Sequence, residues 1–167
     1  MGHLGPDVLG EDWDHGQAVT NLAAYDGLIG DALLDQRNLA GVGTYWASES
    51  LFVERILPWT PARDLGRERI DRLVTRIRAL MDRAKDHAIQ SSTGVLRVGA
   101  ESYVHGRSGR PCRRCGDTIR VAMTGSAPRE RTLFSCPTCQ GGLAPTDAGA
   151  RQAPLGSTRK SRRSYRG

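Results

Sequence analysis

Four cysteines are the residues of this chain whose type and spacing most clearly suggest chemistry. They form two pairs, Cys112-x-x-Cys115 and Cys136-x-x-Cys139. Two such pairs at this separation are typical of a zinc ribbon, in which four thiolates surround one structural Zn²⁺ tetrahedrally. Disulfides or unrelated free thiols are the alternatives, and a reducing compartment disfavours disulfides. The spacing therefore predicts one Zn²⁺ bound by Cys112, Cys115, Cys136 and Cys139.

A second candidate site is the turn Gly41-Val42-Gly43, which precedes a segment of helical character. The first N–H groups of a helix have no intrahelical partner, and the helix dipole favours an anion there. The turn and Thr44 are therefore candidates for binding phosphate, with Arg37 nearby as a cation. The alternative is a turn that only connects two helices. Arg131, between the cysteine pairs, is a further candidate, and its alternative is a solvated surface charge.

The positive charge is unevenly distributed along the 167 residues, whose net charge is +6. Residues 1–60 carry two basic and nine acidic side chains, whereas residues 61–142 carry sixteen basic and eight acidic ones. Residues 143–167 add six basic side chains and one acidic one. The C-terminal two-thirds is therefore the part expected to face a polyanion such as DNA.

The elements that must position these residues follow from periodicity and from breakers. Apolar spacing, capping residues and prolines predict helices over about 14–25, 28–34, 44–56 and 65–89. Alternating residues predict a β-hairpin with strands 118–123 and 131–135, with Arg131 near its tip. The expected fold is therefore mainly α, followed by a small β-hairpin zinc ribbon. Residues 143–167 have few apolar side chains and are expected to form a disordered, Arg-rich tail.

Membrane insertion and secretion are not indicated. No apolar run approaches the 18 or so residues that a membrane span needs, and the first residues lack the basic and apolar regions of a signal peptide. A cytoplasmic protein is the default expectation.

Two motifs in order along the chain resemble one family. LLDQRNLAGVG (33–43) followed by ASESLF (47–52) resembles the helix-two-turn-helix signature of the formamidopyrimidine-DNA glycosylase and endonuclease VIII family. YVHGRSGRPC (103–112) and RTLFSCPTCQ (131–140) are similar to the zinc finger of that family. Residues 87–94 resemble the endonuclease VIII branch. The resemblance covers about residues 4–142 and divides the chain into a linker remnant (1–12), a helix-two-turn-helix domain (13–95), a zinc-finger domain (100–142) and the tail (143–167).

The resemblance implies a role in base-excision repair, in which the family removes oxidised bases and cuts the strand by β/δ-elimination. It implies that Arg131 grips phosphate beside the lesion and that Gly41, Val42 and Gly43 contact the flanking phosphates through the backbone. The family has Asn where this chain has Thr44, whose hydroxyl is a shorter donor. The implied partner is double-stranded DNA with damaged or abasic sites, bound by a monomer in the bacterial cytoplasm and associated with the nucleoid.

The family's catalytic residues have no counterpart here. Family chemistry uses an N-terminal proline as the Schiff-base amine and an adjacent glutamate, whereas positions 2 and 3 of this chain are Gly2 and His3. The family's N-terminal β-sandwich is also expected to be missing, supplied in trans or encoded upstream of Met1. We therefore expect no catalytic residue and no activity from the chain alone. A non-catalytic zinc-dependent DNA-binding module is the alternative function, and a sequence-specific transcription regulator is a weaker one.

Overall fold

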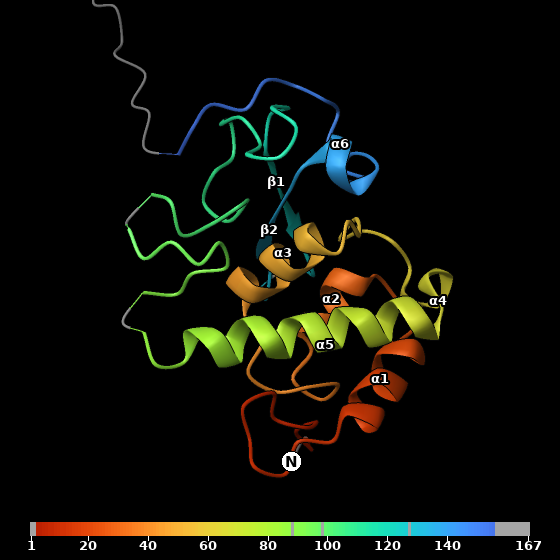
Figure 1. The fold of residues 1–167 in the computed structure, drawn as a ribbon. Coiled ribbons are helices and arrows are strands. Elements are labelled where there is room, and N and C mark those ends of the chain that lie inside the picture. The colour runs from red at the N-terminus through yellow and green to blue at the C-terminus, as the bar shows by residue number, and fades with distance from the viewer. Residues whose placement is uncertain (1–2, 88, 98, 127, 156–167) are drawn as a thin grey trace, which may run out of the picture.

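The fold is mainly helical with one β-hairpin, as predicted. The computed structural model describes residues 3–155 except 88, 98 and 127. Figure 1 shows α5 running across the front of the molecule, with the hairpin and α6 on the other side of α3. The elements are α1 (His15–Ala23), α2 (Ile29–Leu34), α3 (Thr44–Val53), α4 (Ala62–Leu65), α5 (Arg67–Ala84), β1 (Arg120–Thr124), β2 (Arg131–Ser135) and α6 (Pro137–Gln140).

The helix boundaries follow from local chemistry. Asp14 begins α1, because its side chain accepts a hydrogen bond of 3.0 Å from the Gln17 N–H. The single helix predicted over 65–89 is wrong in two respects. Gly66 has a φ of +78°, which separates α4 from α5, so that Gly66 rather than Asp64 precedes the long helix. This helix also ends at Ala84, since the residues after it are too polar to extend its buried face.

The helical part is built around α5. This helix packs on α1 and α3 and buries its apolar stripe while its arginines lie on other faces. The buried residues of α5 are Ile70, Leu73, Val74, Ile77, Leu80, Met81 and Ala84. Leu22 of α1 and Leu51 of α3 join the same core and are fully buried.

The hairpin packs directly on the helices. Its antiparallel strands pair Arg120 with Ser135 and Thr124 with Arg131, and β1 begins two residues later than predicted. Leu133 of β2 belongs to the helical core, and a Cβ on Gly30 of α2 would lie 2.6 Å from Leu133 Cδ1. The absence of a side chain at Gly30 therefore allows β2 to approach α2 closely.

A second, smaller core lies between α3 and the cysteine loops. Phe52 packs there with Ile119 and Phe134, and the guanidinium of Arg114 lies 4.4 Å from the centre of the Phe52 ring. The Phe134 N–H also donates to Ser48 Oγ at 3.1 Å. Helix α3 therefore contributes to both cores, so the helices and the ribbon form one packed body.

The prediction that residues 143–167 form a disordered tail is wrong for residues 143–155. Residues 143–155 pack along the outer side of β1, with Ala144 buried. Asp147 receives two hydrogen bonds from Arg120, in a pair whose side chains are only 12% and 6% exposed. Gln152 bonds both the N–H and the carbonyl of Val121, as a neighbouring strand would. These polar contacts hold the segment against β1, although it has few apolar residues to bury. Residues 156–167 of the predicted tail lie outside the described residues.

The expected linker at the N-terminus is paired with the segment that leads into α3. The Val8 N–H donates to the Ala40 carbonyl at 3.1 Å, and the Ala40 N–H donates to the Pro6 carbonyl at 2.8 Å. Gly5 lies so close to Asn38 that a Cβ there would be 2.5 Å from its backbone. This pairing holds the segment that leads into the turn before α3.

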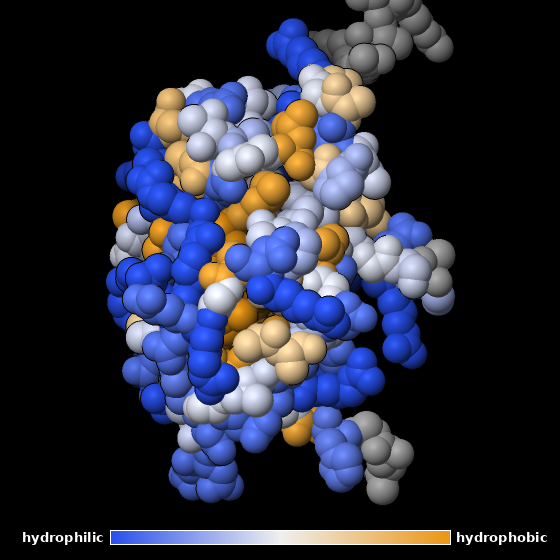
Figure 2. All heavy atoms as spheres, turned by 90° about the vertical axis from the view of Figure 1, so that its right-hand side faces the viewer, coloured by the Kyte–Doolittle hydropathy of each residue, from blue (hydrophilic) through white to orange (hydrophobic). Residues whose placement is uncertain are grey.

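The surface is predominantly polar. Figure 2 shows hydrophilic side chains over most of the visible face, with apolar ones gathered in a narrow band between them. No helix among the described residues is long and apolar enough to cross a membrane.

Candidate nucleic-acid interface and metal centre

The four cysteines converge at the end of the ribbon remote from the hairpin tip. Their Sγ atoms all lie within 4.8 Å of one another, with Cys115–Cys136 at 3.4 Å and Cys112–Cys139 at 3.9 Å. Four sulfurs at Zn–S distances of about 2.3 Å are separated by about 3.8 Å in a tetrahedron, so the cluster fits a tetrahedral metal ion. The predicted ligand set is thus brought together as a possible metal site.

Backbone and side-chain contacts hold the cysteine loops in place. The N–H groups of Arg114 and Asp117 point at Cys112 Sγ and Cys115 Sγ, at 3.3 and 3.4 Å. Gln140 accepts from the Cys136 N–H at 2.7 Å and donates to the Ile56 carbonyl at 2.8 Å. The cysteine cluster is therefore linked to the helices through Gln140, which sequence reasoning did not single out.

The glycine turn is shaped by Gln36. Gln36 Oε1 accepts from the Gly41 N–H at 2.8 Å, and Gln36 Nε2 donates to the Val42 carbonyl at 3.1 Å. Gly41 has a φ of +98°, which favours glycine at this position. Its N–H is therefore already used, while Val42 is buried and its side chain packs in the core.

The N–H groups of Gly43 and Thr44 remain free. Neither has a hydrogen-bond partner in the part of the chain that the structure describes, and both residues are at least partly exposed at the start of α3. They are the donors that the turn offers to an anion, together with the Thr44 hydroxyl, which is also unpaired among the described residues. The turn and Thr44 line a hollow of about 480 Å³ together with Lys85.

Arg37 is held by a neighbouring carboxylate. Its Nε and Nη2 donate to Asp35 at 3.0 and 2.8 Å, and its backbone N–H donates to Asp35 Oδ1 at 3.0 Å. The side-chain hydrogen bonds from Arg37 lower the pKa of Asp35. A phosphate would have to compete with Asp35 for this guanidinium.

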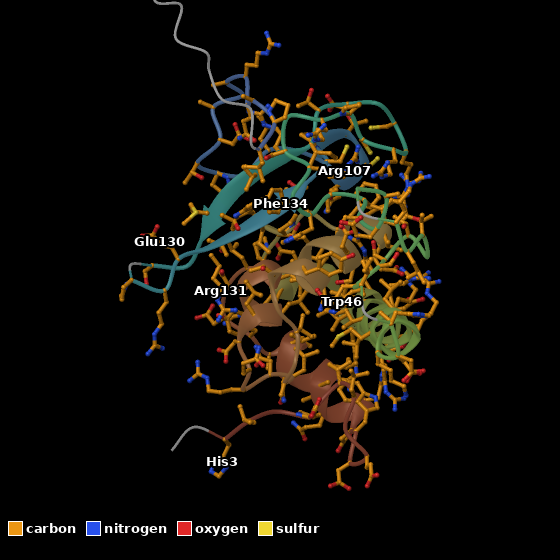
Figure 3. The ribbon with its side chains drawn as sticks, turned by 90° about the vertical axis from the view of Figure 1, so that its left-hand side faces the viewer. His3, Trp46, Arg107, Glu130, Arg131 and Phe134 are labelled. Carbon is orange, nitrogen blue, oxygen red and sulfur yellow. The ribbon has the colours of Figure 1, made fainter. Side chains whose placement is uncertain are left out.

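Arg131 is exposed at the first position of β2. It has no ion pair or side-chain hydrogen bond within the described residues. Figure 3 shows Glu130 and Arg131 at the projecting end of the hairpin, with Phe134 nearer its base. Thr124 at the end of β1 donates a short hydrogen bond to Asp31 of α2, which fixes the tip against the helices. Arg131 is therefore a free cation on an anchored loop.

The structure brings Arg131 and Arg37 to one groove of about 880 Å³, which Gln36 also lines. Gln36 also bonds the backbone of Gly41, which lines the hollow at the turn. The predicted cations and the predicted turn thus lie on neighbouring parts of the surface.

Glu49 was missed by sequence reasoning. It is fully buried on α3 and accepts hydrogen bonds from Ser92 Oγ and from the N–H groups of Tyr103, Val104 and His105. Burial raises the pKa of its carboxyl, although these hydrogen bonds oppose the shift. A carboxylate within the otherwise apolar and small residues of α3 was the available signal. Glu49 connects α3 to the loop that leads into the first cysteine pair.

Comparison with known proteins agrees with this geometry. Residues 4–95 match the family model described as the formamidopyrimidine-DNA glycosylase H2TH domain. The chain is 45% identical over 150 residues to a probable endonuclease 8 2 of Streptomyces coelicolor, covering 89% of this chain and 54% of that protein. It is 40% identical to a DNA-(apurinic or apyrimidinic site) lyase Nei2 of Mycolicibacterium smegmatis, covering 84% and 54%.

Solved structures show the same similarity. The MutM (Fpg) protein of Thermus thermophilus superposes with a TM-score of 0.67 at 31% identity, covering 84% of this chain and 55% of that one. The Lactococcus lactis Fpg in complex with abasic-site DNA gives 0.65 at 28%, covering 83% and 52%. The chain spans about half the length of the curated relatives it matches. Its H2TH domain, its hairpin and its four clustered cysteines identify the chain as a member of the formamidopyrimidine-DNA glycosylase and endonuclease 8 family.

Proposed function

We propose that this chain is the DNA-gripping portion of an endonuclease VIII-like base-excision-repair glycosylase and AP lyase. It binds duplex DNA at damaged or abasic sites, as a monomer in the bacterial cytoplasm. The observation that carries the proposal is the free guanidinium of Arg131 in a groove whose lining residue Gln36 bonds the turn that presents the free N–H groups of Gly43 and Thr44. Family membership favours a repair enzyme over a separate DNA-binding module.

Each group has a definite task in this proposal. Arg131 binds phosphate oxygens with its planar fork of N–H donors, and the start of α3 binds a second phosphate with two N–H groups and the Thr44 hydroxyl. Such contacts fix the position of the duplex without reading its sequence. Gln36 keeps the turn open, and Asp31 keeps the hairpin tip near α2.

The metal in this proposal is one structural Zn²⁺. Cys112, Cys115, Cys136 and Cys139 would hold it, and four thiolates leave no position for a substrate. When bound, Zn²⁺ closes the two cysteine loops onto each other, which stabilises a small β unit that has little core of its own. The ribbon then keeps Arg131 in place.

The described residues offer no positioned nucleophile. Lys85 lies beside the turn, but its Nζ is paired with Asp82 at 2.8 Å, which raises the pKa of the lysine and keeps it protonated. We therefore propose that this chain by itself binds abasic DNA without efficient excision. A nicking assay on abasic and oxidised-pyrimidine duplexes tests this. Turnover equal to that of a full-length relative, abolished by Arg131→Ala, would refute it.

DNA binding is tested by fluorescence anisotropy with a duplex that carries a tetrahydrofuran abasic analogue. Arg131→Ala should weaken binding about 10-fold or more, because a hydrogen-bonded charge contributes about 1.5 kcal/mol or more. Arg69→Ala on the exposed face of α5 is the control with the same change of charge. Equal affinities of the two variants would contradict the role of Arg131.

Metal removal gives an independent test of the ribbon. Metal analysis should find one zinc per chain, and chelation should weaken binding to about the level of Arg131→Ala. Chelation should also have little further effect on that variant. Unchanged affinity after verified zinc loss would show that the ribbon does not position Arg131.

A further inference from the structure

A second groove, of about 1080 Å³, opens beside the loop that leads into the first cysteine pair. Three arginines line it, and the sequence motifs do not assign them any role. Its principal lining residues are Tyr45, Gln90, Glu101, Arg107, Arg110 and Arg113. We call this surface the basic groove.

The arginines of the basic groove are oriented but not neutralised. Arg107 donates to the carbonyls of Tyr103 and Pro111 at 2.8 and 2.9 Å, and Arg113 donates to the Ser102 carbonyl at 2.9 Å. Carbonyl groups fix these side chains without cancelling their charge. No ion pair involves Arg107, Arg110 or Arg113 within the described residues, although Glu101 lies in the same groove.

The three positive charges lie close enough to act on one another. The pKa of Arg107 is lowered, first by burial and then by the charges of Arg113 and Arg110. Holding two exposed positive charges near the partly buried Arg107 costs free energy, which a bound anion would recover. Arg110 is exposed, and its guanidinium has no partner in the described part of the chain, so it is free to meet that anion.

The basic groove is continuous with the phosphate-binding turn. Tyr45 and Gln90 line both the basic groove and the hollow that contains Gly43 and Thr44. The Tyr45 hydroxyl lies 3.1 and 3.0 Å from the carbonyl oxygens of Gln90 and Glu101 and shares its one proton between them, so these walls are held near the start of α3. A strand with a phosphate at the turn would therefore continue directly into the basic groove.

We propose that the basic groove binds the phosphodiester backbone of the strand that continues from the turn, with Arg110 as the direct contact and Arg107 and Arg113 as fixed charges. The inference rests on the proposed function, since it extends the same DNA surface.

The first test is Arg110→Gln, because this side chain has no structural contact to lose. Arg69→Gln on α5 is the matched control, with the same charge change away from the groove. Binding of the tetrahydrofuran duplex is measured over a range of KCl concentrations. Arg110→Gln should weaken binding several-fold and reduce the slope of log K against log[salt] by about 0.9, the value for one lost phosphate contact. An unchanged slope, equal to that of Arg69→Gln, would overturn the proposal.

A second test removes a negative charge from the basic groove instead of a positive one. Among the described residues, Glu101 supplies the one carboxylate that lines the basic groove. Glu101→Gln removes this negative charge, so DNA affinity should rise while folding, checked by thermal unfolding, is retained. Lower affinity in a folded Glu101→Gln protein would contradict a phosphate ligand in this groove.

Duplex length separates a local contact from general attraction. Duplexes are shortened on either the 5′ or the 3′ side of the abasic analogue, and the effect of Arg110→Gln should disappear for only one of them. An effect that persists equally with both would show diffuse attraction and overturn the proposal. If the unaltered chain binds DNA and Arg131→Ala weakens it, but Arg110→Gln does not, only this inference fails. If the unaltered chain does not bind, the proposed function itself fails.

Discussion

At the scale of single residues, the side chain of Gln36 determines the shape of the turn proposed to bind phosphate. Its amide oxygen accepts from the N–H of Gly41, and its amide nitrogen donates to the carbonyl of the next residue, Val42. This engagement consumes the Gly41 N–H and leaves those of Gly43 and Thr44 for a ligand. The turn is therefore already formed before any DNA arrives.

Replacing Gln36 with Ala should loosen the turn. Loss of two hydrogen bonds is expected to lower the free energy of unfolding by about 1–3 kcal/mol, measured by urea denaturation. DNA affinity should fall as well, because the free N–H groups lose their fixed direction. Gln17→Ala is the control, since its side chain makes one exposed bond to Asn21. Similar unfolding free energies for both variants would contradict the role of Gln36.

The buried carboxyl of Glu49 leads to a prediction about pH. Burial raises its pKa above the ordinary value of about 4.3, so the native state retains this proton at pH values where the unfolded chain has lost it. The contribution of Glu49 to the free energy of unfolding is therefore fully present at low pH and decreases as pH rises through the raised pKa. Glu49→Gln lacks this titrating carboxyl but retains the four cysteines, so a comparison with the unaltered chain isolates the effect of Glu49.

The measurement is the difference in unfolding free energy between the unaltered chain and Glu49→Gln at several pH values. This difference should decrease from about pH 4 upward. A difference that grows with pH would mean that the N–H donors of residues 103–105 outweigh burial and lower the pKa instead.

At the scale of elements, the contact between the hairpin and α2 decides where Arg131 lies. Leu133 fills the space above Gly30, and Thr124 bonds Asp31 one residue further along α2. Thr124 lies opposite Arg131 at the tip of the hairpin, and Leu133 lies at the middle of β2. The position of the free cation therefore depends on α2 as well as on the cysteines.

Gly30→Ala should displace the hairpin. Its Cβ would lie 2.6 Å from Leu133 Cδ1 and 3.0 Å from the Pro58 carbonyl oxygen, so overpacking should cost about 1–3 kcal/mol of stability and also reduce DNA affinity. Gly16→Ala in α1 is the matched control. Its nearest neighbour is 3.8 Å away, and helix propensity should make it more stable by up to about 1 kcal/mol. Stabilisation by both substitutions would contradict close packing at Gly30.

Elements with strong local signals were predictable from the sequence. The capping side chain of Asp14, the apolar stripe of α5 and the two cysteine pairs each act over a few residues, and all three are present in the structure. The break at Gly66 was missed because it depends on a positive φ rather than on periodicity.

Contacts between distant segments were not predictable in this way. The packing of residues 143–155 on β1 depends on Asp147 and Gln152 meeting groups about thirty residues earlier in the chain. The same is true of the candidate site. Arg131 and the turn were predicted from motifs, whereas the contacts of Glu49 and the basic groove depend on tertiary proximity.

At the scale of the whole molecule, the C-terminal segment separates into two parts. Residues 143–155 belong to the fold, while residues 156–167 contain five basic side chains and no acidic one. The charge in this last segment should add salt-sensitive attraction to DNA without favouring a lesion.

Deleting residues 156–167 should therefore reduce the salt dependence of binding and leave the preference for abasic over intact duplex unchanged. Deletion from residue 143 is the comparison. It also removes Asp147 from its largely buried ion pair with Arg120, so it should lower the thermal stability of the ribbon in addition. Loss of lesion preference in the shorter deletion, with an unchanged salt slope, would contradict this division.

The membership of α3 in both cores limits how this protein can recombine with its relatives. A crossover between residues 95 and 100 would pack α3 of one parent against Phe134 and Ile119 of the other. Glu49 would then have to accept its hydrogen bonds from a loop that comes from the other parent. Such chimaeras should assemble poorly even when both parents bind zinc and DNA. Exchange of residues 4–155 as one block keeps every one of these partners together, so this block is the unit that evolution or protein engineering can transfer.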